Sequence, residues 1–312
     1  MQAGFHRCVS RRAFLGAGAC ALAGASWLRG VAAQSAAPLI EKIIPVSGER
    51  LPAIGLGSDA FRSSERDAIQ AEIKRMMEMG GTLIDTAAAY GDSEMLIGAA
   101  LAALGVRERV FLATKLTARG QFGDALGGEA SFRRSLARLQ TTRIDLLQVH
   151  NLEGIDSLMP MLQGWKKAGQ IRYFGATTSR SAQHAELVRA MRSYPLDFVQ
   201  VDYSIANRDA ADTVLPLAIE RRMAVLINLP FARASLLAQA GQRQLPDWAA
   251  SIDVTSWGQF LLKYVISHPA VTCAIPGSTK LEHLQDNQLA ARGRLPDPVM
   301  RRKMEEFWDA GS

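Results

Sequence analysis

From position 39 onward the chain alternates between two patterns of hydrophobic positions. Short continuous apolar runs are followed by longer segments in which apolar residues return every three or four positions. The first pattern predicts strands buried on both faces, and the second predicts amphipathic helices. The predicted strands are 53–57, 83–85, 110–115, 144–150, 171–177, 198–203, 224–230 and 271–276. The clearest predicted helices are 66–80, 93–104, 156–169, 256–268 and 297–310.

This alternation predicts the fold class. About eight β/α units in roughly 240 residues match the count and length of an α/β fold, the (β/α)8 TIM barrel. An open doubly wound sheet is the competing architecture, but no Gly-x-Gly-x-x-Gly motif follows the first predicted strand. We therefore predict the barrel, with an N-terminal hairpin that turns at Ser47 and Gly48 and caps the barrel floor.

The first 33 residues have the pattern of an export signal. Arg11 and Arg12 precede a Gly/Ala-rich apolar stretch, and Val31 and Ala33 suit a small-residue cleavage site. The pattern resembles a twin-arginine signal, with an uncleaved anchor or a chance Arg pair as alternatives. We expect a signal peptide over 1–33, a linker over 34–38 and one barrel domain over 39–312. The expected location is periplasmic or exported, with the export machinery as a partner, and a cytoplasmic protein is the alternative.

Composition and charge narrow the expected partners. The chain has 312 residues, of which 48% are hydrophobic and 21% charged, as in globular proteins. Four of the 36 basic residues and none of the 30 acidic ones lie in the first 33 positions, so the net charge of +6 falls to +2 beyond them. We expect no nucleic-acid partner and no stable membrane insertion of the mature chain. Cys273 is the only cysteine after the signal, so no intrachain disulfide is expected.

Four polar residues at predicted strand ends form a candidate catalytic group. Asp85, Lys115 and His150 end the second, third and fourth predicted strands, and Tyr90 lies in the loop after Asp85. The C-terminal ends of barrel strands meet at one face. A lysine stabilises a phenolate, a carboxylate keeps the lysine charged, and an imidazole polarises a carbonyl. The group therefore predicts protonation of a carbonyl oxygen while hydride reaches the carbon, although Lys115 and His150 taken singly are better explained by structural roles.

The chain resembles the aldo-keto reductase family from about 43 to 287. Five segments carry the resemblance: IDTAAAYGDSE, FLATKL, IDLLQVHN, GQIRYFGAT and VTCAIPGSTKLEHLQDN. It implies an NADP(H)-dependent oxidoreductase that reduces a small-molecule aldehyde or ketone to an alcohol. It also implies that Asp85, Tyr90, Lys115 and His150 are the catalytic tetrad, with Tyr90 as the general acid.

The resemblance further implies a nicotinamide cofactor, NADPH, with NADH as the alternative. Gln200 matches the glutamine that hydrogen-bonds the nicotinamide carboxamide in the family. Thr177 and Thr178 stand where the family usually has Ser-Asn for the same group. The residues expected at the adenosine end are Ser278, Lys280, His283 and Asn287.

Departures from the family's pattern keep other functions open. Asn228 stands where many members place an aromatic residue under the nicotinamide ring, and Gly277 and His283 replace a common Lys and Arg. The choice between NADPH and NADH stays open, and a cofactor-binding redox sensor or subunit with an unknown redox partner is the alternative function. A metal-dependent hydrolase using Asp85 and His150 is a third hypothesis. The chain has five His and no His-x-His pair, so we expect no metal.

Overall fold

Eight parallel strands form the centre of the computed structural model, which describes residues 37–116, 128–241 and 243–311. They run in the order β10-β9-β8-β7-β6-β5-β4-β3, so each strand pairs with its neighbour in the sequence. Their bounds are β3 (Leu56–Gly57), β4 (Leu83–Asp85), β5 (Phe111–Leu116), β6 (Ile144–Val149), β7 (Ile171–Thr177), β8 (Phe198–Asp202), β9 (Ala224–Asn228) and β10 (Cys273–Ala274). Every residue of β5 and β6 is buried, as expected of parallel strands that are covered on both faces.

The first and last strands meet and close this sheet into a barrel. Single parallel bridges join Ile54 to Ala274 and Gly57 to Gly277. Gly57 permits this close approach, because a Cβ atom there would lie 2.7 Å from the carbonyl oxygen of Ile275. The predicted (β/α)8 TIM barrel is confirmed.

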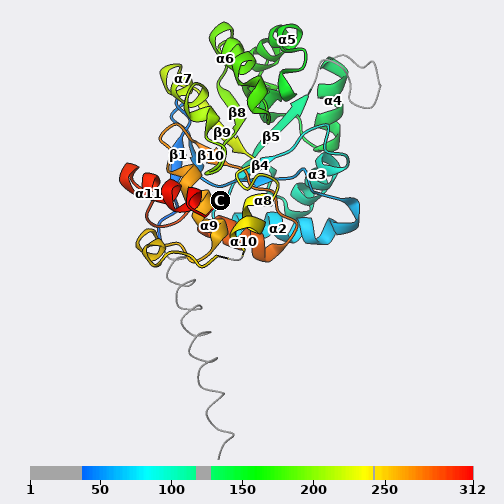
Figure 1. Ribbon diagram of the computed structural model, residues 1–312. Helices are drawn as coiled ribbons and strands as arrows, with labels where there is room; N and C mark the ends of the chain where they lie inside the picture. The colour runs from blue at the N-terminus through cyan, green and yellow to red at the C-terminus, as the bar shows by residue number, and fades with distance from the viewer. Residues whose placement is uncertain (1–36, 117–127, 242, 312) are drawn as a thin grey trace, which may run out of the picture. The chain divides into compact units, whose positions relative to one another are not determined.

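Helices surround the strands on the outside of the barrel (Figure 1). Their bounds are α2 (Arg66–Glu78), α3 (Ser93–Leu104), α4 (Gly128–Arg138), α5 (Ile155–Lys167), α6 (His184–Ser193), α7 (Val214–Glu220), α8 (Ser235–Ala240), α9 (Trp257–Ile266), α10 (Leu281–Leu289) and α11 (Pro298–Asp309). Short 3-10 turns are η1 (Ser63–Glu65), η2 (Arg107–Arg109), η3 (His150–Leu152), η4 (Ser181–Gln183), η5 (Asp209–Ala211) and η6 (Asp247–Ile252). The predicted helix 93–104 coincides with α3. Helix α11 begins one residue after the prediction, since Asp297 is its N-cap and accepts from the Met300 amide.

The predicted hairpin is present at the N-terminal end of the barrel. Strands β1 (Glu41–Ile43) and β2 (Arg50–Pro52) pair antiparallel. The connecting turn includes Gly48, whose φ of +80° suits a residue without a side chain. Ile44 and Leu51 of this hairpin belong to the apolar cluster formed by inward-facing residues of the barrel strands. The hairpin therefore caps the barrel floor, as predicted.

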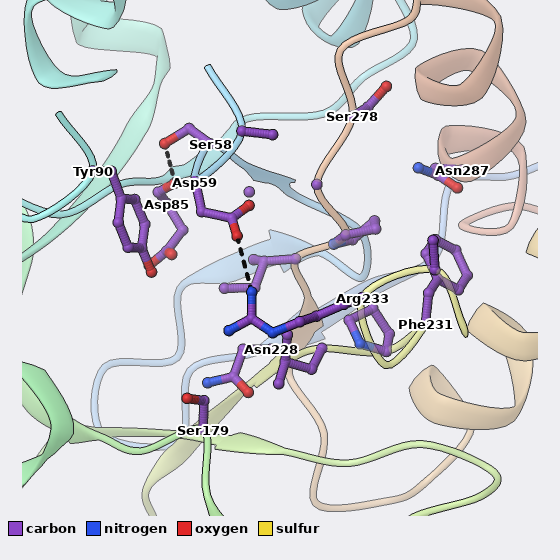
Figure 2. A pocket seen from close by; sticks show the side chains of 18 of the residues that line it. Ser58, Asp59, Asp85, Tyr90, Ser179, Asn228, Phe231, Arg233, Ser278 and Asn287 are labelled. Carbon is purple, nitrogen blue, oxygen red and sulfur yellow. Dashed lines mark hydrogen bonds and ion pairs between the residues drawn. The ribbon is translucent and has the colours of Figure 1, made fainter. Parts of the chain in front are cut away.

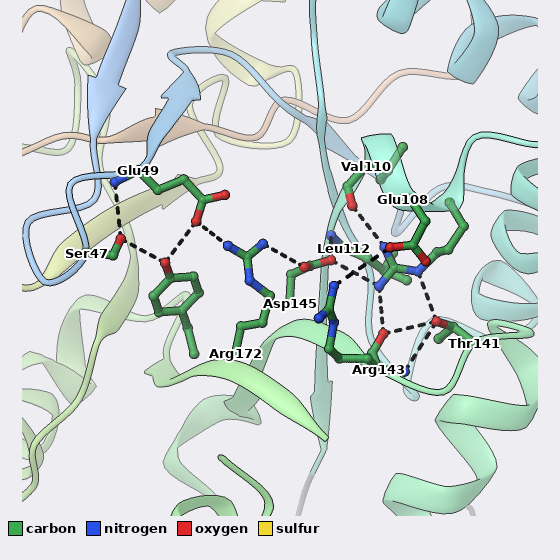
Figure 3. A network of polar contacts seen from close by, with 11 residues as sticks. Ser47, Glu49, Glu108, Val110, Leu112, Thr141, Arg143, Asp145 and Arg172 are labelled. Atoms are coloured by element: carbon green, nitrogen blue, oxygen red, sulfur yellow. Dashed lines mark hydrogen bonds and ion pairs between the residues drawn. The ribbon is translucent and has the colours of Figure 1, made fainter. Parts of the chain in front are cut away.

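A network of ion pairs ties the hairpin to the barrel strands (Figure 3). The carboxylate of Asp145 on β6 accepts from Arg107 at 3.0 Å, from Arg172 at 2.9 Å and from the Leu112 amide at 2.9 Å. Arg172 also pairs with Glu49 of the hairpin at 2.5 Å. We call these five residues the floor network. Each of its charged groups has at least one partner of opposite charge.

The export signal and the absence of membrane insertion stay predictions. The predicted signal over 1–33 lies outside the described residues, which from Pro38 onward form one compact unit. Among the residues that the structure describes, no helix is long and apolar enough to cross a membrane.

Candidate active site

A cavity of about 760 Å³ lies at the C-terminal ends of the barrel strands. In Figure 2, Asp85 and Tyr90 lie on one side of it, and Ser278 and Asn287 lie on the other. The predicted site residues that line it are Asp85, Tyr90, Lys115, His150, Thr177, Gln200, Ser278, His283 and Asn287. Thr178 and Lys280, which were also predicted, do not line it.

The backbone around Tyr90 is fixed by hydrogen bonds to the neighbouring strand. After β4 ends at Asp85, the amides of Thr86 and Ala88 donate to carbonyl groups of β5 at 2.9 and 3.2 Å. Gly91 has a φ of +57°, which allows the chain to turn sharply into α3. This turn holds the Tyr90 ring at the cavity wall, half-buried.

Asp85 and Lys115 form a buried ion pair beneath Tyr90. Lys115 Nζ lies 2.5 Å from Asp85 Oδ2 and donates to the Thr86 carbonyl at 2.8 Å, and both side chains are almost fully buried. Burial by itself lowers the pKa of Lys115, but Asp85 and Tyr90 more than offset it, so the pKa lies above its usual value. The lysine is therefore charged at neutral pH. Asp85 Oδ1 is buried and has no hydrogen-bond partner within the described chain.

Tyr90 contacts both Lys115 and His150. Lys115 Nζ lies 5.0 Å from the centre of the Tyr90 ring, and the rings of Tyr90 and His150 meet edge to face at 5.8 Å. The sequence led us to expect that the lysine lowers the pKa of Tyr90. It does so, but burial has the larger effect, and the pKa is raised overall. Tyr90 is therefore a protonated phenol at neutral pH, which is the state required of a proton donor.

His150 is uncharged at neutral pH. Burial, and then the charge of Lys115, lower its pKa to about 3. A neutral imidazole has one N–H donor and one acceptor nitrogen. His150 is thus suited to hydrogen-bond a carbonyl oxygen without adding a second positive charge beside Lys115.

Gln200 on β8 has a buried partner that the sequence analysis missed. Its Oε1 accepts from Gln148 Nε2 at 2.7 Å, and both side chains are buried. Gln148 lies on β6 and does not line the cavity. Its only signal in the sequence is a polar residue inside an apolar strand. The contact fixes the Gln200 carboxamide. Burial raises the pKa of Asp85 overall, and this carboxamide has a smaller effect that lowers it.

Thr178 does not line the cavity, but it hydrogen-bonds residues around it. Its hydroxyl donates to Gln183 at 2.7 Å and its amide donates to the Gln200 carbonyl at 3.0 Å. Its own carbonyl accepts from Asn228 Nδ2 at 3.0 Å. Asn228 lines the cavity, and its Oδ1 is buried without a hydrogen-bond partner in the described part of the chain. Thr177, not Thr178, is therefore the member of this pair that a ligand in the cavity meets.

At the other end of the cavity, Ser278 organises the segment that leads into α10. Its Oγ donates to the Lys280 carbonyl at 2.9 Å, while the Lys280 amide lies 3.2 Å from the same oxygen. The Lys280 side chain is exposed. Ser278, His283 and Asn287 are the predicted residues that this end brings together.

An exposed ion pair crosses the cavity between these ends. Arg233, in the loop after β9, lies 4.0 Å from Asp59, in the loop after β3 (Figure 2). Neither residue stands out in the sequence, because their proximity depends on the closure of the barrel. Such an exposed pair contributes little to stability.

The described residues offer no group of three His, Cys, Asp or Glu side chains that could hold a metal ion. Asp85 is already paired with Lys115. The hydrolase hypothesis, which needs several such ligands, finds no support in this part of the chain.

Comparison with known proteins assigns the chain to a family. The model of the aldo/keto reductase family matches residues 53–306, which is most of the chain. The chain belongs to the aldo/keto reductase family. Methylglyoxal reductase YeaE of Escherichia coli is 31% identical over 261 residues, which cover 79% of this chain and 88% of that protein.

Solved aldo/keto reductases have the same fold. One from Klebsiella pneumoniae, in complex with NADP and acetate, superposes with a TM-score of 0.73 at 25% identity, covering 86% of this chain and 96% of that chain. Another from the same organism, in complex with NADPH, has a TM-score of 0.71 at 26% identity, covering 87% and 96%. The prediction of an enzyme of this family is therefore confirmed.

Proposed function

We propose that this aldo/keto reductase reduces the carbonyl group of a small aldehyde or ketone, with NADPH as the hydride donor and Tyr90 as the proton donor. The observation that carries the proposal is the buried ion pair of Lys115 and Asp85 against the Tyr90 ring, in one cavity with a neutral His150. No structural role requires a phenol, an ammonium group and an imidazole to line the same cavity.

The cavity fits an extended dinucleotide. It is about 760 Å³ in volume, and its lining includes Asn228, whose buried Oδ1 has no partner in the described residues. Gln200 and Thr177 would hold the nicotinamide carboxamide, and Ser278 and Asn287 would hold the adenosine end. When bound, the reduced cofactor supplies a hydride to the carbonyl carbon.

The proton is supplied by the chain's own residues. Tyr90 donates its phenolic hydrogen to the carbonyl oxygen, and the charge of Lys115 stabilises the phenolate that remains. His150 hydrogen-bonds the same oxygen and orients it. Asp85 keeps Lys115 charged and in place.

The test is cofactor binding followed by turnover. We expect fluorescence titration to show NADPH binding, and absorbance to show its consumption with methylglyoxal, the substrate in the name of the Escherichia coli relative, and with a nitrobenzaldehyde. Failure to bind either nicotinamide cofactor would contradict the proposal.

A second candidate function is a cofactor-binding sensor or subunit with little turnover. It is favoured by Asn228, whose amide is tied to the Thr178 carbonyl at the place where many family members have an aromatic ring. Tight binding of NADPH without turnover over a broad panel of carbonyl compounds would favour this function over the reductase.

We also propose that the protein is exported, on the pattern around Arg11 and Arg12. Replacing both by Lys should retain the precursor in the cytoplasm, whereas the wild-type protein should appear outside it with an N-terminus near Gln34. Finding only full-length wild-type protein in the cytosol would favour the cytoplasmic alternative.

A further inference from the structure

A buried carboxylate lies behind the adenosine end of the cavity. Glu72 on α2 is 1% exposed, and its Oε2 has no hydrogen-bond partner within the described residues. Its Oε1 lies 3.5 Å from Ser278 Oγ, which is a long contact for a hydrogen bond. Burying a carboxylate with so few partners costs folding free energy. Such an unpaired buried group indicates a role in the function of the adenosine end of the cavity.

Ser278 stands between Glu72 and the cavity. Its hydroxyl has a single hydrogen to donate. Two acceptors for that hydrogen lie in the chain, the Lys280 carbonyl at 2.9 Å and Glu72 Oε1 at 3.5 Å. Because Ser278 lines the cavity, a ligand bound there would be a third acceptor. A carboxylate at Glu72 accepts this hydrogen and a neutral acid does not, so the protonation state of Glu72 changes the directions that are open to the Ser278 hydroxyl.

We propose, resting on the proposed function, that Glu72 acts through Ser278 to select between NADH and NADPH. As a carboxylate, Glu72 accepts the hydroxyl hydrogen, and Ser278 then accepts from the 2′-hydroxyl of the NADH ribose. As a neutral acid, Glu72 donates to Ser278, and the Ser278 hydrogen turns from the Lys280 carbonyl to the 2′-phosphate of NADPH. Glu72 is thus a positioning residue for cofactor choice, and low pH favours NADPH.

Both forms of Glu72 are populated near neutral pH. Burial raises the pKa of Glu72 to about 7, with the Ser278 contact lowering it and the charge of Glu65 raising it. A carboxylate also repels a nearby phosphate, so ionisation disfavours NADPH for a second reason. The charged and titratable groups on α2 and on the elements packed against it are Glu65, Arg66, Asp67, Lys74, Arg75, Glu78, Glu94, Glu282, His283 and Asp286.

The same end of the cavity has few fixed positive charges with which to bind a phosphate. Gly277 has no side chain, the Lys280 side chain does not line the cavity, and His283 does line it. Arg233 also lines the cavity and is paired with Asp59. The direction of the Ser278 hydroxyl therefore contributes to the discrimination beside this one paired charge.

The experiment measures dissociation constants of NADPH and NADH by fluorescence titration at about pH 6 and about pH 8. In the wild type, the ratio of the NADPH to the NADH constant should rise by about tenfold between the two values, the change expected for one linked proton. In Glu72→Gln, whose neutral amide also donates to Ser278, the ratio should rise about tenfold less than in the wild type. The 2′-phosphate also titrates in this range, but it is common to both proteins and cancels in the comparison.

Two further variants control the result. Glu78→Gln removes the same charge from an exposed position on α2, and it should keep the wild-type pH dependence. Ser278→Ala removes the hydroxyl through which Glu72 acts, so it should lose most of that dependence even if Glu72→Gln does not fold. The part that remains is the direct repulsion between Glu72 and the phosphate.

The outcomes separate this proposal from the proposed function. Binding of both cofactors with the same pH dependence in the wild type and in Glu72→Gln, or a ratio in the wild type that does not change with pH, would overturn the role of Glu72 alone. A wild-type protein that binds neither cofactor would overturn both.

Discussion

The two ends of the barrel bury charged groups in opposite ways. At the floor, Asp145 has two arginine partners and a backbone amide, and Arg172 has two carboxylate partners. At the C-terminal end, Asp85 Oδ1 and Asn228 Oδ1 are buried without hydrogen-bond partners in the described residues. The floor network is complete within the chain, whereas the cavity end leaves polar atoms unpaired where a ligand would lie.

This difference separates stability from function. Complete pairing stabilises a barrel at its N-terminal face, and reactive groups collect at its C-terminal face. At the cavity end Asp85, Tyr90 and Lys115 perturb one another's pKa and line a cavity, a combination typical of active sites. Substitutions at the floor should therefore change the free energy of unfolding, and those at the cavity end should change turnover.

The largest effect is expected from Lys115→Met. Turnover should fall by about 10²–10⁴-fold, because no charge then stabilises the Tyr90 phenolate. The free energy of unfolding should also fall by about 3–5 kcal/mol, since the buried Asp85 loses its only cation partner among the described residues. Steady-state kinetics and urea unfolding measure the two effects.

The double variant Lys115→Met with Asp85→Asn sharpens this prediction. It removes the uncompensated charge, so it should recover part of the lost stability but none of the lost turnover. Recovery of both would mean that the pair has only a structural role.

Tyr90→Phe should affect turnover alone. The phenol hydrogen is lost, so the chemical step should slow by about 10²–10⁴-fold, while the ring still packs against His150. NADPH affinity and the thermal midpoint should stay near wild type. Single-turnover kinetics of the preformed NADPH complex measure the chemical step, and a rate close to wild type would exclude Tyr90 as the proton donor.

Arg172→Met should have the converse effect at the floor. It removes hydrogen bonds to Asp145 and Glu49, which should cost about 1–3 kcal/mol of unfolding free energy and leave kcat unchanged. Arg50→Met is the matched control, because Arg50 pairs with Glu41 at an exposed position and should cost less than about 1 kcal/mol. A large loss of kcat in Arg172→Met without loss of stability would contradict the division between the two ends.

The smallest effect concerns the pH dependence of His150. Its pKa is about 3 in the folded protein, so the pH profile of turnover should show no fall caused by this residue between about pH 5 and about pH 8. The unfolded state binds the proton near pH 6.5, so this histidine lowers stability as pH falls below that value. His150→Gln should therefore lose less unfolding free energy than wild type between about pH 7 and about pH 5. An equal loss in both proteins would mean that His150 titrates normally.

The sequence predicted those features that depend on local pattern. Strands and helices could be predicted from the spacing of apolar residues. Both bounds of α3 were predicted to the residue, and the helix ends where Gly105 adopts the left-handed conformation. Asp85, Tyr90, Lys115 and His150 could be grouped because barrel strand ends converge whatever the detailed packing.

The features that escaped prediction depend on contacts between distant segments. Glu72 and Ser278 are 206 positions apart, and Gln148 meets Gln200 across 52 positions. The net pKa of Tyr90 was equally beyond sequence reasoning, because it depends on how far burial outweighs the charge of Lys115. Lys280 was predicted at the site from its position in the motif, but its side chain is exposed and does not line the cavity.

A crystal structure of the mature protein with NADP bound tests most directly whether the unpaired polar atoms of the cavity end form a cofactor site. We predict that the nicotinamide ring lies beside Tyr90 and Lys115, with its carboxamide on Gln200 or Asn228, and that the adenosine lies beside Ser278 and Asn287. A cofactor bound in the reverse direction, or at a site away from this cavity, would contradict the assignment.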